Sequence, residues 1–282
     1  DTYVCKGFET VADYKLKCHV FSTIGSHGSL TVEQALMNSC NPYMIHLALE
    51  MGNSRFAYYQ SLFGFGKITG IDLPGETTGI VYGDRMTTID AACNSFGQTI
   101  NVNMMQMMAA YCSIINGGML YQPHIVKRIE SANGEVVKEY KANLVRQTIT
   151  ASTSKLLRRY LKNTVEEGTA KKAGVTGYSV AGKTGTAQKG DRKDNKWIIS
   201  FIGHAPAENP KFAIYVVIDE PYGTTGTSGS SADVLTLTHN ILEKLLPYMN
   251  VYKDASDEYE DTSSSPDELT VDGIPAGTAS SN

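Results

Sequence analysis

The sequence contains no run of apolar residues long enough to cross a lipid bilayer, for which a helix needs about eighteen or more. Its first residues, Asp1 to Phe8, have neither a basic start nor an apolar stretch, so no secretory signal is indicated. The chain opens on Asp1 and enters patterned sequence at once, which leads us to expect that a segment of the parent protein precedes it. With 282 residues, 41% of them hydrophobic, the chain has enough apolar side chains for a globular core.

Cysteine is also scarce. Five cysteines are too few and too scattered for a fold built on disulfides, so most are expected to be ordinary buried thiols. Cys5 and Cys18, with His19 and His27 close behind, are the exception, because they can form either a disulfide or a metal site. Their spacing fits no standard zinc pattern, which leaves the identity of any metal ligand open.

A concentrated positive charge is absent as well. The formal net charge is −4, but residues 251–282 hold eight acidic residues against Lys253 alone and contribute −7. The first 250 residues therefore carry +3, which is too little to indicate nucleic acid as a partner. Residues 251–282 are acidic and poor in aromatic residues, so we expect a disordered tail attached to one domain over residues 1–250.

Helix signals are frequent along the chain. Thr31 and Gln34 form a capping-box pattern that predicts a helix start, and Asn41-Pro42 predicts the start of a second helix that runs to Gly52. The other helices are expected over 54–62, from 104 to the glycines at 117 and 118, over 152–167 and over 232–246.

Strand signals are concentrated in the second half. Asn133-Gly134 is the strongest hairpin signal and lies between the runs 124–130 and 135–140. Three strand-like runs follow, over 178–188, 197–205 and 212–219. The sum is an α+β fold in which an antiparallel sheet is packed by helices.

The sharpest motif surrounds Lys183 and admits two incompatible interpretations. Residues 177–184 match the phosphate-loop pattern G-x-x-x-x-G-K-[ST], which would predict a nucleotide triphosphatase. A phosphate loop must enter a helix, but Gly185 and Gly190 follow the lysine closely and no helix can start there. Residues 178–180 favour extended structure, so the match is interpreted as a coincidence on a strand.

The second interpretation takes Lys183-Thr184-Gly185 as the K-T-G motif of serine acyl transferases that act on D-alanyl peptides and β-lactams. Lys183 would supply a positive charge for a substrate carboxylate, and hydroxyls at Thr184 or Thr186 would hydrogen-bond to it. Gly185 lets a substrate approach the backbone closely. Because side chains alternate along a strand, Lys183 and Gly185 are expected on one face and the threonines on the other, so a shared site requires twist or a bend.

A second motif, Ser39-Cys40-Asn41, has the pattern S-x-N and lies at the predicted junction between two helices. Polar side chains at such a junction can face a cleft instead of the core. Helix capping by Ser39 and Asn41 is the alternative, which the motif on its own does not exclude.

Together these motifs resemble the transpeptidase domain of class B penicillin-binding proteins over nearly all of residues 1–250. The resemblance implies the penicillin-binding and serine β-lactamase-like transpeptidase fold, with its amino-terminal portion missing from this sequence. The further matching stretches, in the same order, are Phe63-Gly64-Phe65-Gly66, residues 69–76, Ser95-Phe96-Gly97-Gln98, Asn116-Gly117-Gly118, residues 181–188 and Ser200-Phe201-Ile202-Gly203.

The family's nucleophilic motif, S-x-x-K, has no match before Ser39, although the family order requires it there. The acylated serine is therefore expected in an upstream segment of the same protein. Ser152-Thr153-Ser154-Lys155 has the pattern but follows the S-x-N motif, and Ser152 is interpreted as a helix cap. Ser131-Ala132-Asn133 repeats S-x-N but is interpreted as part of a hairpin turn.

The resemblance implies peptidoglycan cross-linking through an acyl-enzyme. A serine outside this sequence attacks D-Ala-D-Ala, its neighbouring lysine acts as base, and an amine of another stem peptide accepts the acyl group. By the same resemblance Ser39 relays a proton to the leaving group, Asn41 binds the substrate's amide chain, and Lys183 with Thr184 and Thr186 anchors the carboxylate. The backbone N–H of Thr186 forms half of the oxyanion hole.

The partners that the resemblance implies are peptidoglycan stem peptides, β-lactam antibiotics and the missing upstream segment, with no cofactor. It also implies a location at the outer face of the bacterial cytoplasmic membrane, anchored through that segment. Two alternatives keep the fold. One is a β-lactamase or D,D-carboxypeptidase, which would turn β-lactam over rapidly; the other is a non-catalytic penicillin-binding-like scaffold, which would lack an upstream S-x-x-K.

Overall fold

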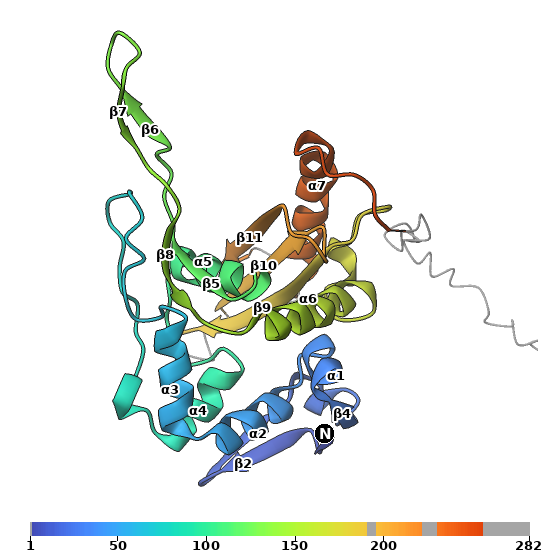
Figure 1. The fold of residues 1–282 in the computed structure, drawn as a ribbon. Coiled ribbons are helices and arrows are strands. Elements are labelled where there is room, and N and C mark those ends of the chain that lie inside the picture. Colours follow the sequence, from blue (N-terminus) through green and yellow to red (C-terminus); the bar gives the residue numbers. More distant parts are fainter. Residues whose placement is uncertain (1, 191–195, 222–229, 256–282) are drawn as a thin grey trace, which may run out of the picture.

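The computed structural model describes residues 2–190, 196–221 and 230–255. Its centre is an antiparallel three-stranded sheet in the order β11-β10-β9, formed by Phe212–Asp219, Lys196–Ala205 and Ala181–Lys189 (Figure 1). The register places Lys183 opposite Ile202 and Gly185 opposite Ser200. The predicted α+β fold with a helix-packed antiparallel sheet is confirmed.

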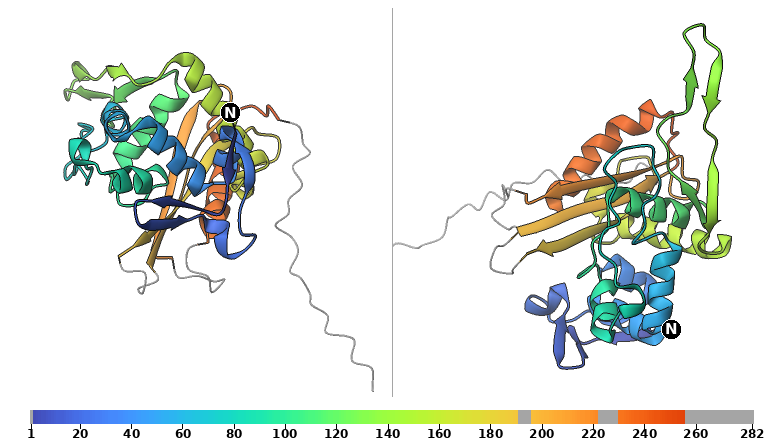
Figure 2. Two further views of the ribbon diagram at one scale, coloured as in Figure 1. Left: turned by 90° about the horizontal axis from the view of Figure 1, so that it is seen from below. Right: turned by 90° about the vertical axis from the view of Figure 1, so that its left-hand side faces the viewer.

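Helices cover both faces of this sheet (Figure 2). On one face, Ile199 and Phe201 are buried against Val234, Leu242 and Leu246 of α7, which spans Ala232–Tyr248. On the other face, Ile202 and Ala213 pack with Tyr111 and Ile115 of α5 and Leu161 of α6. α5 spans Met104–Ile115 and α6 spans Ala151–Glu166. Alternate residues of β10 therefore enter two different cores, as the two-residue period of a strand requires.

The first hundred residues form a second layer, on the side of α6 (Figure 1). Two small sheets begin it, β1 with β4 and β2 with β3, each of two antiparallel strands. The strands are β1 Thr2–Cys5, β2 Phe8–Val11, β3 Tyr14–Lys17 and β4 Gly28–Thr31. The helices are α1 Val32–Met37, α2 Asn41–Met51, α3 Asn53–Leu62 and α4 Thr88–Ser95, with short 3-10 turns at His19–Ser22 and Gly83–Arg85. A further 3-10 turn, Lys171–Ala173, lies outside this layer and follows α6.

The helix predictions are confirmed to within two residues at nearly every end. α1 begins after Thr31, whose side chain accepts a hydrogen bond from the amide of Gln34, in the predicted capping box. α2 begins one residue before the predicted Pro42. One cap was wrong: α6 is capped by Thr150, whose hydroxyl accepts from the amide of Thr153, and Ser152 lies inside the helix.

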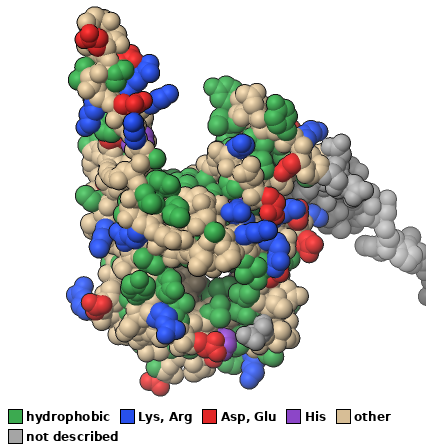
Figure 3. Space-filling view, in the orientation of Figure 1, with side chains coloured by type: hydrophobic (Ala, Val, Ile, Leu, Met, Phe, Trp, Pro, Cys, Tyr) green, Lys and Arg blue, Asp and Glu red, His purple; other side chains and the backbone are tan. Residues whose placement is uncertain are grey.

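The predicted hairpin at Asn133-Gly134 is present and projects from the body of the molecule (Figure 1). It joins β6, Arg128–Glu130, to β7, Val136–Glu139. Figure 3 shows charged side chains of both signs over this projection, and Lys and Arg side chains gathered over α6. The strands at its base, β5 Met119–Gln122 and β8 Asn143–Gln147, were not predicted.

The packed part of the chain continues past residue 250, where the sequence led us to expect a disordered tail. Val251 is buried in the same core as α7, and the carboxylate of Asp254 accepts a hydrogen bond of 2.7 Å from the amide of Ser179. The ordered body therefore extends at least to Ala255, because one apolar and one acidic side chain find partners there. The rest of the predicted tail, residues 256–282, lies outside the described residues.

Among the described helices, none is long and apolar enough to cross a membrane.

Candidate functional site

Lys183, Thr184 and Gly185 lie in the first half of β9, which continues without interruption to Lys189. A phosphate loop requires a helix after its lysine, so the nucleotide interpretation of residues 177–184 is excluded. A Cβ added to Gly185 would lie 2.6 Å from the hydroxyl of Ser200 on β10. A larger residue at this position would therefore have to displace the Ser200 hydroxyl.

Ser39 occupies a tight turn between α1 and α2. Its φ of 52° is in the left-handed region, which non-glycine residues adopt at an energetic cost. The turn is fixed by two backbone hydrogen bonds, from the amide of Ser39 to Leu36 and from that of Cys40 to Ala35, at 3.2 and 2.9 Å. In this conformation the Ser39 hydroxyl contacts Lys183 of β9 and Thr169.

The ammonium of Lys183 donates a hydrogen bond to the hydroxyl of Ser39, across 144 positions of sequence. The same ammonium lies 3.3 Å from the hydroxyl of Thr184 and 3.2 Å from its carbonyl. The hydroxyl of Thr169 is 3.4 Å from both Ser39 Oγ and Thr184 Oγ1. We call Ser39, Thr169, Lys183 and Thr184 the hydroxyl–lysine cluster.

Thr169 was not singled out in the sequence, although it completes this cluster. It follows Gly168 just after α6, and its amide donates to the carbonyl of Met37 at 3.1 Å. A Cβ on Gly168 would lie 2.8 Å from that same carbonyl, so only glycine permits the approach. The sequence signal that pointed to Thr169 was a Gly-Thr pair at the end of a predicted helix. Its importance depends on the packing of α1 against α6, which the sequence alone did not show.

Burial lowers the pKa of Lys183 to about 8, from an ordinary value of 10.5. Its neighbours are hydroxyl groups and a carbonyl, which accept hydrogen bonds from an ammonium but carry no compensating negative charge. The group can therefore exchange a proton close to neutral pH, and it remains available for an anionic ligand.

Asn41 and Thr186 lie outside the hydroxyl–lysine cluster in the described structure. The side-chain amide of Asn41, in the first turn of α2, donates to the carbonyl of Lys17 at 3.3 Å. Thr186, two residues beyond Thr184 on β9, has an exposed side chain. Of the six predicted site residues, the structure thus joins Ser39, Lys183 and Thr184 directly, with Gly185 next along the strand.

The two other motif matches, S-x-x-K at residues 152–155 and S-x-N at residues 131–133, have structural roles. The side chains of Ser152 and Lys155 are exposed in the first turns of α6, and the Ser152 hydroxyl contacts Thr150. Ser131 accepts the turn-closing hydrogen bond from the amide of Gly134, and its hydroxyl bonds to Asn133 within the hairpin. Neither pattern is therefore needed to account for a site.

Three cysteines and one histidine meet beneath the S-x-N turn. The ligand atoms of Cys5, Cys18, His27 and Cys40 all lie within 4.8 Å of one another. A hydrogen bond from the Cys40 thiol lowers the pKa of Cys18 to about 5. The structure thus brings together three residues considered in the sequence and adds Cys40, whereas His19 instead contacts the carbonyl of Asn38 at 2.9 Å.

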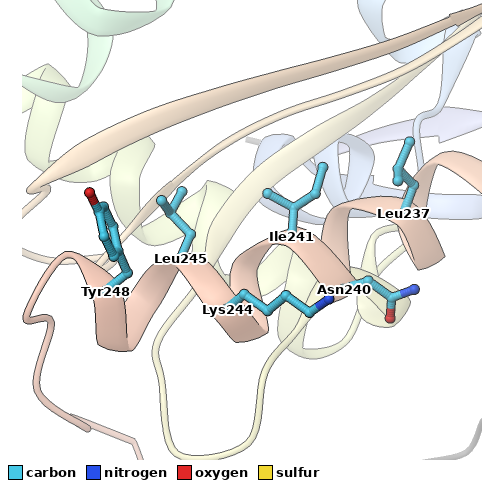
Figure 4. A pocket seen from close by; sticks show the side chains of 6 residues that line it. All are labelled: Leu237, Asn240, Ile241, Lys244, Leu245 and Tyr248. Carbon is cyan, nitrogen blue, oxygen red and sulfur yellow. The ribbon is translucent and has the colours of Figure 1, made fainter.

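An apolar groove on the outside of α7 contains none of these residues. Figure 4 shows Leu237, Ile241, Leu245 and Tyr248 pointing to one side of the helix, with Asn240 and Lys244 beside them. The groove is lined by residues of α7 alone and contains no member of the hydroxyl–lysine cluster, so it has no part in a reaction at that cluster.

Comparison with known families gives a match over most of the chain. Residues 5–243 match the family described as the penicillin binding protein transpeptidase domain. Stage V sporulation protein D of Bacillus subtilis strain 168 is 39% identical over 256 residues, which is 89% of this chain and 39% of that protein. Peptidoglycan D,D-transpeptidase FtsI of Escherichia coli K12 is 32% identical over 248 residues, which is 86% of this chain and 40% of that protein.

Solved structures agree with the sequence match. Penicillin binding protein 3 of Mycobacterium tuberculosis, complexed with aztreonam, superposes with a TM-score of 0.79 at 28% identity. The superposition covers 91% of this chain and 59% of that one. The same protein complexed with ampicillin gives a TM-score of 0.80. The chain thus spans well under half the length of the two curated relatives described above, 39% and 40%.

Proposed function

Because the chain belongs to the penicillin-binding protein transpeptidase domain family, we propose that it supplies the second and third active-site motifs of a peptidoglycan D,D-transpeptidase. The reaction is acyl transfer from D-Ala-D-Ala stem peptides, and β-lactams occupy the same site. The contact between Lys183 of K-T-G and Ser39 of S-x-N carries this proposal. The two motifs lie 144 positions apart in the sequence, and this hydrogen bond brings their polar side chains together, as a shared site requires.

The hydroxyl–lysine cluster supports distinct roles for its members. While the Ser39 oxygen accepts from Lys183, its own proton is free to be donated to the leaving amine, and the lysine can replace that proton. In its protonated form Lys183 also attracts the substrate carboxylate, with Thr184 and Thr186 as hydrogen-bond donors. Asn41 binds the amide chain of the substrate, and the amide of Thr186 provides half of the oxyanion hole.

The nucleophilic serine and its lysine base belong, in this proposal, to an S-x-x-K segment upstream of residue 1. That segment also anchors the protein at the outer face of the bacterial cytoplasmic membrane. The partners of the complete protein are stem peptides and β-lactams. The names of the relatives, which include peptidoglycan D,D-transpeptidase, support this assignment.

Labelling with a fluorescent penicillin tests the proposal. The chain is produced in two forms, the 282 residues alone and a form extended upstream by the parent's own sequence. We expect the extended form to be labelled and the shorter form to remain unlabelled, since only the former has a serine that can be acylated. Lys183→Ala in the extended form should lower the acylation rate by roughly a hundredfold or more, the loss expected when one group that stabilises charge in the transition state is removed.

Ser152→Ala and Lys155→Ala are the matched controls, because they change the decoy S-x-x-K pattern on α6. Both should leave labelling unchanged. Labelling of the shorter chain at any serine, or loss of labelling in the Ser152→Ala variant, would contradict the proposal. A folded extended chain that hydrolyses the penicillin rapidly, without a lasting adduct, would instead identify a β-lactamase.

A further inference from the structure

The atoms of Cys5, Cys18, His27 and Cys40, which we call the thiol–histidine cluster, have the spacing of a tetrahedral metal site. Cys18 Sγ and Cys5 Sγ lie 3.6 and 3.8 Å from His27 Nδ1, and all four ligand atoms lie within 4.8 Å of one another. With Zn–S and Zn–N bonds of about 2.3 and 2.1 Å, tetrahedral coordination separates sulfur from nitrogen by about 3.6 Å. The cluster therefore surrounds a volume that one zinc ion would fill.

The sulfur atoms are surrounded by backbone amides that suit thiolates. The amide of Gly7 donates to Cys5 Sγ at 3.4 Å. The backbone amides of Val20 and Asn41 lie near the sulfur of Cys18, and that of Tyr43 lies near the sulfur of Cys40. Such donors orient and stabilise metal-bound thiolates from outside the coordination sphere. Ordinary buried thiols need no such arrangement.

The two sheets beside the cluster are small. β1 pairs only with β4 and β2 only with β3 among the described strands, and two-stranded sheets are marginally stable in water. The core beneath them includes the three cysteines among its seven buried residues. Small apolar cores of this kind are usually reinforced by a disulfide or a metal. A disulfide would join two of the sulfurs and leave the third thiol and the imidazole unused.

From this geometry we infer that Cys5, Cys18, His27 and Cys40 bind one structural Zn²⁺ ion, which fastens the S-x-N turn to the amino-terminal strands. Cys40 lies between Ser39 and Asn41, so a metal ligand is part of the motif itself. The chain around Cys18 holds the same turn at two more points. Lys17 accepts from the Asn41 side chain at 3.3 Å, and His19 contacts the carbonyl of Asn38 at 2.9 Å.

The first test measures the metal content of the 282-residue chain by inductively coupled plasma mass spectrometry. One zinc per chain is expected after desalting, and the Cys18→Ser and His27→Ala variants should retain far less. Cys93→Ser and Cys112→Ser are matched controls, because these cysteines lie outside the cluster and should leave the ratio at one. This readout needs neither substrate nor the upstream serine, so it succeeds or fails independently of the transpeptidase proposal.

Wild-type protein alone also suffices to overturn the inference, even if the variants fail to fold. Cobalt substitution should give the strong visible absorption of a tetrahedral thiolate site. Absence of bound metal after one equivalent of Zn²⁺ is added, or a resting disulfide between any two of the three cysteines in a non-reducing peptide map, would overturn it. Equal zinc retention by Cys18→Ser and wild type would mean adventitious binding elsewhere and would overturn it too.

Hydrogen exchange tests the link to the S-x-N turn. Removing the metal with a chelator should speed exchange at the amides of Ser39 and Cys40 by at least tenfold, because the turn loses its attachment to β1 and Cys18. Exchange on β10, at Ile199 and Phe201, should change little, since these residues lie in a separate core. Unchanged exchange at Ser39 and Cys40 would refute the fastening role.

Discussion

Lys183 carries an ammonium among hydroxyl and carbonyl groups, a position in which burial of the charge lowers folding stability. In the unfolded chain its pKa has the ordinary value of 10.5, whereas in the folded state burial lowers it to about 8. Below pH 8 both states are protonated and the folded state bears the full cost of burying the charge. Between pH 8 and 10.5 the unfolded state binds more protons, so stability rises with pH in this window.

We therefore expect the Lys183→Met variant to be more stable than wild type at pH 7. Each kcal/mol gained in the free energy of unfolding should raise its Tm by about 2–4 °C. The advantage should shrink as the pH rises from 8 toward 10.5, because the wild-type lysine then loses its charge. Thermal unfolding of both proteins across this range checks the prediction.

Lys189→Met, on the same strand, is the control. Its ammonium lies 2.8 Å from Asp219 and 2.9 Å from Glu220, so its removal should give no gain in stability. A Lys183→Met variant less stable than wild type at pH 7 would show that hydrogen bonding to Ser39 outweighs the burial of the charge.

At the scale of elements, helix starts depend on single polar side chains, which are threonine hydroxyls at α1, α4 and α6 and the Asn103 amide at α5. Capping boxes begin α1, α4 and α5, and in each the cap residue and the third helical residue exchange hydrogen bonds. α6 has a one-sided cap, in which Thr150 accepts from the amide of Thr153 at 3.1 Å. The sequence favoured Ser152 for this role, although Thr150 lies only two positions earlier.

The two candidates for the α6 cap are separable by mutation. Thr150→Ala should lower the free energy of unfolding by about 1 kcal/mol, the usual loss for a threonine cap. Ser152→Ala should change it by less than about 0.5 kcal/mol, because alanine is favourable inside a helix and Ser152 is exposed. Urea denaturation of the two variants decides between them, and a larger loss for Ser152→Ala would mean that the helix starts later than the structure shows.

Features encoded in neighbouring residues were predictable from the sequence, and features that depend on distant pairing were not. The capping box at Thr31, the hairpin at Asn133-Gly134 and the three sheet strands follow from local patterns. β1 was missed because its four residues pair with β4, more than twenty positions away, and show no clear alternation. The S-x-N and K-T-G motifs were visible, but Thr169 gained its meaning only from the contact of α1 with α6.

The thiol–histidine cluster illustrates the same limit. Cys5, Cys18 and His27 drew attention because they are close in sequence, yet their spacing matched no standard metal motif. Cys40 was assigned to the S-x-N pattern and left out of the metal hypothesis. The fourth member became apparent only when the turn before α2 was seen to lie against β1 and the end of β3.

On the scale of the whole molecule, the segment that follows α7 packs against the sheet domain. Val251 adds to the core under α7, with 6% of its surface exposed, and Asp254 binds the amide of Ser179 just before β9 begins. The hydroxyl of Ser179 also donates to Asp254 and accepts from the amide of Ala207. These contacts link the carboxyl-terminal segment to the strand that carries Lys183.

Two truncations test this link. A chain that ends at Ala255 should keep the Tm of the full chain, because residues 256–282 are acidic and have few apolar side chains to bury. A chain that ends at Asn250 should lose on the order of 2–4 kcal/mol, from one buried valine and the hydrogen bonds to Asp254. The Asp254→Asn variant of the chain that ends at Ala255 should have a free energy of unfolding between those of the two truncated chains. Equal stability of both truncations would contradict the packing described here.

β11 lies at the outer edge of the three-stranded sheet and, among the described strands, pairs only with β10. Its sequence, Phe-Ala-Ile-Tyr-Val-Val-Ile-Asp, is almost entirely apolar and rich in β-branched residues. A long apolar edge strand is a template on which another chain can add a strand. Purified alone at high concentration, these 282 residues are therefore prone to self-association and precipitation. Crystallisation should favour a form in which another chain covers the free edge of β11.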